Sequence, residues 1–249
     1  MAEAAVAPDT RTSAPGGPLL AVRDLEGWYG ESHVLHGVAF DVHRGEVVTL
    51  LGRNGAGKTT TLKAIIGILT QRKGSIRFDG DETIGLPARA IARLGIGYVP
   101  EERGIFSSLS VEENLMLPPQ IGQGGMSVDE IFEMFPNLRE RRKTAQGTKL
   151  SGGEQQMLAM ARILRTGANL LLLDEITEGL APVIVQALGR VIVKLKERGF
   201  TIVLVEQNFR FAAPLADRHY VMEHGKIAET FAAAELESKT QMLHEYLGV

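Results

Sequence analysis

The chain has 249 residues, of which 44% are hydrophobic, and its formal net charge is −3. This length and composition can bury the core of one domain with a smaller subdomain. They exclude a membrane-spanning helix, because no stretch approaches the roughly 18 apolar residues that a span requires. The dispersed basic residues likewise predict no nucleic-acid partner.

The first 18 residues are rich in Ala, Pro and Gly and have neither a basic start nor an apolar run. This composition predicts a disordered N-terminal tail rather than a signal peptide, and it leaves residues 19–249 as the folded domain. From Leu19 to about Val99 the pattern predicts short strands. Residues 43–45 and 79–80 carry hairpin-like turn signals.

A phosphate-binding loop follows the β-branched run Val47–Leu51. The segment Gly52–Thr59 matches the pattern GxxxxGK[ST] and opens a predicted helix over 59–68. In such loops backbone N–H groups cradle phosphates, the Lys reaches the β- and γ-oxygens, and the Thr binds magnesium. The strand-loop-helix setting favours this function over a glycine-rich turn. We therefore expect ATP and Mg²⁺ to bind at Gly52, Arg53, Asn54, Gly55, Ala56, Gly57, Lys58, Thr59 and Thr60.

The stretch from about 101 to 165 has a helical pattern, with predicted helices over 111–115 and 129–135. A third helix begins after the run Leu150-Ser151-Gly152-Gly153-Glu154-Gln155-Gln156. Ser151 and Glu154 have the spacing of a capping box. The Ser151 hydroxyl and the backbone N–H groups of Gly152 and Gly153 also suit phosphate at a helix start. A helix cap alone would not require two glycines.

An apolar run, Leu170–Leu173, predicts a buried parallel strand that ends in two carboxylates. At this end of the strand Asp174 would hold Mg²⁺, and Glu175 would polarise the water that attacks the γ-phosphate. Further on, the pattern predicts a helix over 183–198, ended by Gly199, and a strand over 201–205.

These three motifs, in this order, resemble the nucleotide-binding domain of ATP-binding-cassette (ABC) ATPases from about Leu19 onward. The resemblance implies an α/β fold: a P-loop NTPase core with an antiparallel β subdomain and an inserted α-helical subdomain at about 101–165. It also implies a dimer with a second copy or a paralogue. In that dimer Lys58 of one protomer and Ser151 of the other would contact the same ATP.

Smaller motifs of this family can be placed on the chain. Tyr29 lies where such domains stack an aromatic ring on adenine; Trp28 is the alternative in a different register, and both rings also suit a core. Glu101 lies at the position of the family's Gln loop and is a candidate metal ligand. Gln207 lies at the position of the switch histidine and, with Lys58 and Glu175, is assigned to catalysis.

Four positions depart from the general family pattern. Glu101 replaces Gln, and Gln207 replaces His, which removes an ionisable group beside the γ-phosphate. Ile176 replaces Pro in the turn after the carboxylates. Ala181 replaces an Asp that makes a contact across the dimer.

These departures resemble one subfamily. The strings over 97–106, 177–182 and 205–208 are similar to ATPase subunits of branched-chain amino-acid importers, the LivF type; urea and short-chain amide importers are related. The resemblance implies ATP-driven uptake through integral membrane permease subunits, served indirectly by a periplasmic solute-binding protein. The chain would lie peripherally at the cytoplasmic face of the inner membrane, and its lack of cysteine fits a reducing compartment. The solute rests on analogy alone.

Two other functions are less compatible with the sequence. A soluble cassette ATPase of DNA repair or translation would need a coiled-coil insertion, a tandem cassette or a basic surface, and the sequence has none. A GTPase-like switch would need an Asn-Lys-x-Asp motif, which is absent. The six histidines show no familiar metal-ligand spacing, so we expect them to be surface or core groups.

Overall fold

The computed structural model describes residues 16–122, 124–142 and 150–248. The first 15 residues of the predicted tail lie outside this part of the chain. One sheet is antiparallel, with the strand order β2-β1-β4-β5. It consists of β1 (Leu20–Tyr29), β2 (Ser32–Val42), β4 (Gln71–Phe78) and β5 (Asp81–Glu82). This sheet confirms the predicted antiparallel β subdomain.

A second, six-stranded sheet has the order β10-β9-β3-β8-β7-β6. All its pairs are parallel except β9 with β10. The parallel pairing brings the carboxyl ends of its central strands to one edge. Its strands are β3 (Val47–Leu51), β6 (Ile96–Val99), β7 (Leu170–Asp174), β8 (Thr201–Glu206), β9 (Arg218–Glu223) and β10 (Lys226–Ala232).

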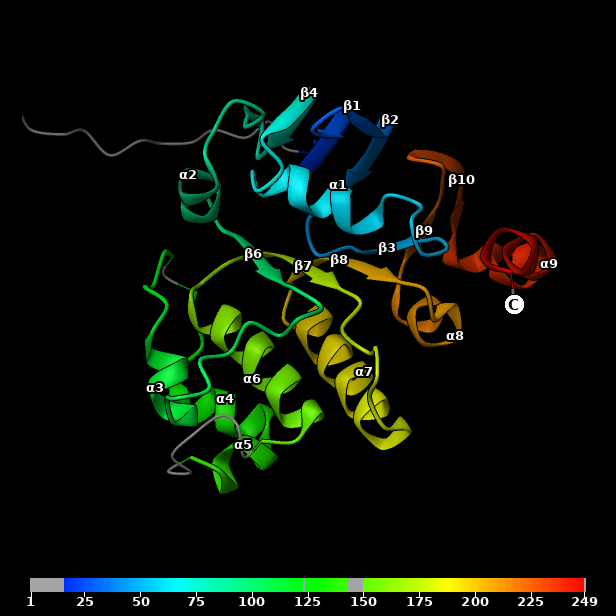
Figure 1. The fold of residues 1–249 in the computed structure, drawn as a ribbon. Helices are drawn as coiled ribbons and strands as arrows, with labels where there is room; N and C mark the ends of the chain where they lie inside the picture. The colour runs from blue at the N-terminus through cyan, green and yellow to red at the C-terminus, as the bar shows by residue number, and fades with distance from the viewer. Residues whose placement is uncertain (1–15, 123, 143–149, 249) are drawn as a thin grey trace, which may run out of the picture.

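Helices cover both faces of this sheet (Figure 1). On one face α1 (Lys58–Ile65) lies between the six-stranded sheet and the antiparallel sheet. On the other face lie α6 (Gly152–Arg165) and α7 (Pro182–Glu197). The residues of β7 alternate between the two cores: Leu171 and Leu173 face α6 and α7, whereas Leu170 and Leu172 join the cluster around α1. Burial on both faces explains the uninterrupted apolar run.

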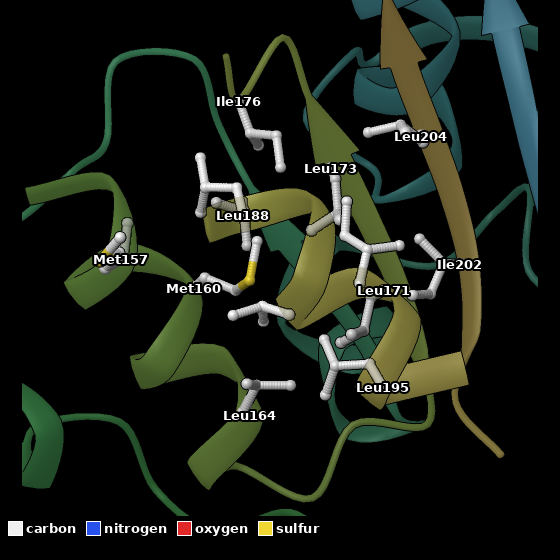
Figure 2. Packing of buried hydrophobic residues seen from close by; sticks show 14 of the residues in the cluster. Met157, Met160, Leu164, Leu171, Leu173, Ile176, Leu188, Leu195, Ile202 and Leu204 are labelled. Carbon is white, nitrogen blue, oxygen red and sulfur yellow. The ribbon is translucent and has the colours of Figure 1, made fainter. Parts of the chain in front are cut away.

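Figure 2 shows the core between the six-stranded sheet and the two long helices. Met160 and Leu164 of α6 and Leu188 and Leu195 of α7 pack with side chains of β7 and β8. Each fully buried Leu contributes about 1.5–3 kcal/mol relative to an exposed one. This packing holds the edge with Asp174 rigidly against α6 and α7.

Three shorter helices lie beside α6 (Figure 1). They are α3 (Val111–Met116), α4 (Val128–Met134) and α5 (Pro136–Glu140). Helices α3, α4 and α6 each begin with a Ser-x-x-Glu capping box in which both hydrogen bonds are formed. The capping box predicted at Ser151 is therefore confirmed, and so are the helices predicted in this stretch.

Of the two hairpin turns predicted in the strand region, one is confirmed and one is wrong. The turn at 79–80 joins the antiparallel strands β4 and β5, as predicted. The hairpin predicted at 43–45 is wrong, because β2 pairs with β1 and β3 pairs with β8 and β9. The turn signal is real, but there the chain crosses from one sheet to the other.

The remaining helices are α2 (Ala88–Arg93), α8 (Phe209–Ala212) and α9 (Leu236–Leu247), with short 3-10 segments at Ala213–Leu215 and Ala233–Glu235. Within the described ranges, no helix is both long enough and apolar enough to cross a membrane.

Candidate functional site

The phosphate loop joins the carboxyl end of β3 to α1. Gly55 and Gly57 have φ angles of 82° and 104°, in the region that favours glycine. A Cβ on Gly52 would lie 2.6 Å from the carbonyl oxygen of Met222, so a side chain has no room there. The glycines of the motif therefore serve a tight backbone turn that leaves N–H groups uncovered.

Lys58 is almost fully buried, and three acceptors surround its ammonium group. Its Nζ donates to the carbonyl oxygens of Gly52 at 2.8 Å and Arg53 at 3.1 Å. It also forms an ion pair with Oε1 of Glu175 at 3.0 Å. The loop carbonyls and Glu175, the predicted catalytic base, thus hold the Lys58 ammonium group that is expected to bind phosphate.

Glu175 follows β7 in an uncommon backbone conformation. Its φ angle is 44°, in the left-handed region that residues other than glycine rarely adopt. Its N–H donates to the Val205 carbonyl of β8 at 2.9 Å, which holds the turn in place. Strained backbone of this kind clusters at functional sites when the surrounding structure fixes it.

Asp174 is fully buried and accepts two hydrogen bonds. Thr59 donates from Oγ1 to Oδ1 at 2.8 Å, and the Tyr98 hydroxyl donates to Oδ2 at 2.8 Å. Burial raises the pKa of Asp174, while these two hydrogen bonds act in the opposite direction. Tyr98 comes from β6, the strand that pairs with β7. Sequence reasoning gave it no role, because its contact with Asp174 depends on that pairing.

A cavity of about 300 Å³ lies in front of the loop. Carboxylate oxygens of Glu101, Glu175 and Glu178 approach within 4.8 Å of one another at this cavity. Burial, followed by the charge of Glu175, raises the pKa of Glu101, and a hydrogen bond with Glu175 raises that of Glu178. The lining residues are Val34, Asn54, Gly55, Gly57, Lys58, Thr59, Thr60, Glu101, Glu175 and Glu178.

This donor set fits a hard divalent cation. Mg²⁺ prefers oxygen ligands, and the Thr59 hydroxyl and the carboxylates of Asp174 and Glu101 supply them. The pKa values of Glu101 and Asp174 are raised, and a bound cation would relieve the repulsion among the crowded carboxylates. Glu178 was recognised in the sequence only as part of a loop, and its place at the cavity is new.

Glu206 is a further buried carboxyl group at this edge. It is 2% exposed, and the single Thr177 hydroxyl lies 3.0 and 2.9 Å from its two carboxyl oxygens, Oε1 and Oε2, in a shared hydrogen bond. Burial raises the pKa of Glu206 to about 8. Sequence reasoning missed the pair because it joins the turn after β7 to the end of β8, across the sheet.

Two predicted site residues, Tyr29 and Gln207, do not line the cavity. Tyr29 ends β1 and is 48% exposed, whereas the ring of Trp28 stacks on His33 with centroids 4.5 Å apart. Of the two aromatic residues, Tyr29 has the ring that solvent or a base can reach. Gln207 is exposed directly after β8, and its carbonyl accepts from the Phe209 N–H at 2.9 Å.

The predicted signature residues are not brought to the cavity within one chain. Ser151 is exposed, and its N–H donates to Oε2 of Glu154 at 2.7 Å in the capping box. A Cβ on Gly153 would lie 2.7 Å from Ile184 of α7, so this glycine has a packing role that the sequence did not reveal. A Cβ on Gly152 would meet the guanidinium of Arg103 at 3.2 Å.

Comparison with known families and proteins agrees with this geometry. The family model described as ABC transporter matches residues 35–178. BraG of Pseudomonas aeruginosa, a high-affinity branched-chain amino acid transport ATP-binding protein, is 43% identical and aligns with 92% of this chain and 100% of its own length.

Two further relatives serve an amino-acid transporter and a lipopolysaccharide exporter, respectively. A probable branched-chain amino acid transport ATP-binding protein LivF of Archaeoglobus fulgidus is 37% identical, over 88% of this chain and 94% of that protein. The lipopolysaccharide export system ATP-binding protein LptB of Haemophilus influenzae is 35% identical, over 92% and 97%.

A solved structure shows the same architecture. The ATP binding subunit of an ABC transporter superposes with a TM-score of 0.76 at 30% identity, over 93% of this chain and 100% of that one. This likeness confirms the predicted fold class. The family match covers the phosphate loop, the carboxylate pair and the signature run together. The chain therefore belongs to the ABC transporter family and is an ATPase of that family.

Proposed function

We propose that this chain is the ATP-hydrolysing subunit of an importer of branched-chain or related hydrophobic amino acids. The observation that carries the ATPase part is the Lys58–Glu175 contact of 3.0 Å beside the phosphate loop. Similarity to BraG over its full length supports the amino-acid class. The chain would work peripherally, at the cytoplasmic face of the inner membrane, with permease subunits and indirectly with a periplasmic solute-binding protein.

In the proposed mechanism the phosphates of ATP take over the contacts of Lys58. The ammonium group then exchanges Glu175 for β- and γ-oxygens, as phosphate-loop lysines do. The released Glu175 carboxylate orients the attacking water and accepts its proton. Gln207, beyond the end of β8, would orient the same water through its amide, which has one acceptor and two donors.

Thr59, Asp174 and Glu101 are the residues that we propose for Mg²⁺. Bound there, the ion neutralises charge on the phosphate oxygens. The hydrogen bond from Thr59 to Asp174 keeps these two ligands together before any cation arrives. Tyr98 then acts as a positioning residue, because its hydroxyl holds the second oxygen of Asp174.

A second ATPase copy or a paralogue would complete the site. Ser151, Gly152 and Gly153 lie at the start of α6, where Ser151 is exposed and Gly153 is buried, and none of them lines the cavity of their own chain. Their hydroxyl and N–H groups would close on the nucleotide of the partner protomer. Tyr29 would stack on the adenine from the antiparallel sheet.

Reconstitution tests this function. The chain would be co-expressed with candidate permease subunits and purified with them into liposomes. We expect ATP hydrolysis that leucine or isoleucine stimulates through the solute-binding protein, and no stimulation in the Glu175→Gln variant. Stimulation by urea or a short-chain amide, with none by leucine, would refute the amino-acid assignment while leaving the ATPase assignment intact.

Lipopolysaccharide export is the second candidate, favoured by 35% identity to LptB over nearly the whole chain. The two functions require different membrane partners. Mass spectrometry of the membrane protein that co-purifies with the chain separates an amino-acid permease from a lipid exporter.

A further inference from the structure

A compact group of two imidazoles and one carboxylate lies on the antiparallel sheet, away from the catalytic carboxylates. It consists of Glu26 of β1 and His33 and His36 of β2. One ligand atom from each residue can be chosen so that all three lie within 4.8 Å of one another. None of the three lines the nucleotide cavity, although Val34, which lies between the two histidines in the chain, does.

Irregular strand pairing brings the two histidines together. Residues three apart on a regular strand point to opposite faces. Here Gly27 pairs with Leu35 and Trp28 pairs with His33, so Val34 is an extra residue that shifts the alternation of β2. The rings of His33 and His36 consequently lie with centroids only 4.0 Å apart.

Cross-strand contacts add the carboxylate and fix one ring. Glu26 lies directly opposite His36 in the sheet, and its Oε2 contacts Nε2 of His33. Trp28 stacks on the His33 ring at an interplanar angle of 12°. The imidazole plane is therefore held before any ligand binds, which lowers the entropy cost of binding.

The chemistry of these donors selects a class of metal. Imidazole nitrogen is a ligand for zinc, copper and nickel, whereas magnesium prefers oxygen. Ligands at about 2.0–2.2 Å from a common ion lie at most about 4.4 Å apart. Small side-chain rotations therefore bring the three atoms into range. His33 and Glu26 have side chains about one-third exposed, at 36% and 34%, so solvent can supply the remaining ligands.

We propose that Glu26, His33 and His36 bind one divalent transition-metal ion of the zinc and nickel class. Three protein ligands leave an open coordination position for water or for a group from another molecule. This assignment replaces the sequence-based expectation that the histidines are only surface or core groups, because the spacing of the ligands is set by a bulge and not by a linear motif.

The test uses Trp28, the single tryptophan of the chain, as its reporter. Tag-free, nucleotide-free protein in a buffer that does not chelate metals is titrated with Ni²⁺ while tryptophan fluorescence is recorded. Because Trp28 stacks on His33, a paramagnetic ion at the site should quench its emission. We expect saturable quenching at one ion per chain, prevented by prior saturation with Zn²⁺. Calorimetry with Zn²⁺ in excess Mg²⁺, which occupies the proposed oxygen-ligand site beside the phosphate loop, measures the same stoichiometry directly.

His36→Gln and Glu26→Gln should each weaken Ni²⁺ and Zn²⁺ binding by at least about tenfold, since each removes one of three protein ligands. His43→Gln is the matched control: His43 is exposed just beyond the same strand, outside the cluster, and its loss should change nothing. Thermal melting identifies a variant that fails to fold, and the other variant then decides. Wild-type affinity in both folded variants, or no saturable binding to the wild type, would overturn the proposal.

Discussion

Two regions that the sequence marks as phosphate-binding are prepared to very different degrees. At the carboxyl edge of the six-stranded sheet, Lys58, Glu175, Thr59 and Asp174 already contact one another around a cavity. At the start of α6, Ser151 is exposed, and its hydroxyl accepts a hydrogen bond from the N–H of its capping partner, Glu154. In both motifs, side chains form hydrogen bonds within one chain.

The difference teaches that a motif can be locally complete and still be functionally incomplete. The loop edge is assembled by strands that meet within one chain, so its side chains are in place without a partner. In the proposed dimer, the helix start would act on the nucleotide bound by the other protomer. The predictions below test whether this division between a cis half and a trans half holds.

The largest effect is expected for Glu175→Gln, in the half that is assembled in cis. The amide keeps the size of the side chain but cannot accept the proton of water, so turnover should fall by roughly 10² or more. ATP binding should persist, and an ATP-dependent dimer should accumulate on gel filtration. Hydrolysis at the wild-type rate would remove Glu175 from the mechanism.

Complementation tests the trans half. Lys58→Ala should inactivate its own cavity, and Gly152→Asp should place a carboxylate against the partner's phosphates. The Asp variant should fold, because acidic groups stabilise helix starts and its Cβ meets only the flexible end of Arg103. If the site is shared, mixing the two inactive variants one to one restores about a quarter of the wild-type sites in a symmetric dimer. A mixture as inactive as its components would place Ser151 outside the nucleotide site.

Gln207→Ala tests whether the residue after β8 contributes to hydrolysis in the cis half. We expect at least a tenfold loss of turnover, about 1.4 kcal/mol of transition-state stabilisation, with little change in ATP affinity. Gln207→His should retain activity and add a pH-dependent limb around pH 6.5 that an amide lacks. Steady-state ATPase assays of both variants decide this, and full activity in Gln207→Ala would make the residue a surface amide.

Glu206→Gln tests whether the buried carboxyl group of Glu206 lowers the stability of the fold at high pH. The folded pKa of about 8 lies above the unfolded value of 4.5, so the folded state retains the proton in this interval. The contribution of Glu206 to the stability of the wild type is therefore greatest below the unfolded value and is lost as the pH rises through about 8. The amide variant should gain at least about 1 kcal/mol over the wild type at pH 8.5 relative to pH 5. Denaturant titrations at both pH values measure the difference, and parallel curves would contradict it.

The smallest effect is expected for Tyr98→Phe. It removes one hydrogen bond to Asp174, worth about 1–3 kcal/mol to a charged acceptor, without creating a large cavity. We expect an increase of a few fold in the Mg²⁺ concentration that half-activates hydrolysis, with folding intact. An unchanged magnesium dependence would show that Thr59 alone positions the carboxylate.

The sequence predicted the parts of this site that are contiguous in the chain. The phosphate loop and the Asp-Glu pair each follow a buried strand, and a local pattern is enough to recognise that setting. The contacts of Tyr98 and Glu206 depend on which strands pair, and strand order cannot be read from periodicity. The cluster of Glu26, His33 and His36 was missed because it depends on a single extra residue in β2.

The strand that presents the phosphate loop has neighbours from far along the chain. Strand β3 ends at residue 51, yet its partners β8 and β9 span residues 201–223. During synthesis the loop-bearing strand therefore waits for most of the chain to leave the ribosome before it can be paired. A nascent chain that stops before residue 201 contains the whole phosphate motif but lacks the strands that hold it, so ATP binding is a property of the nearly finished polypeptide.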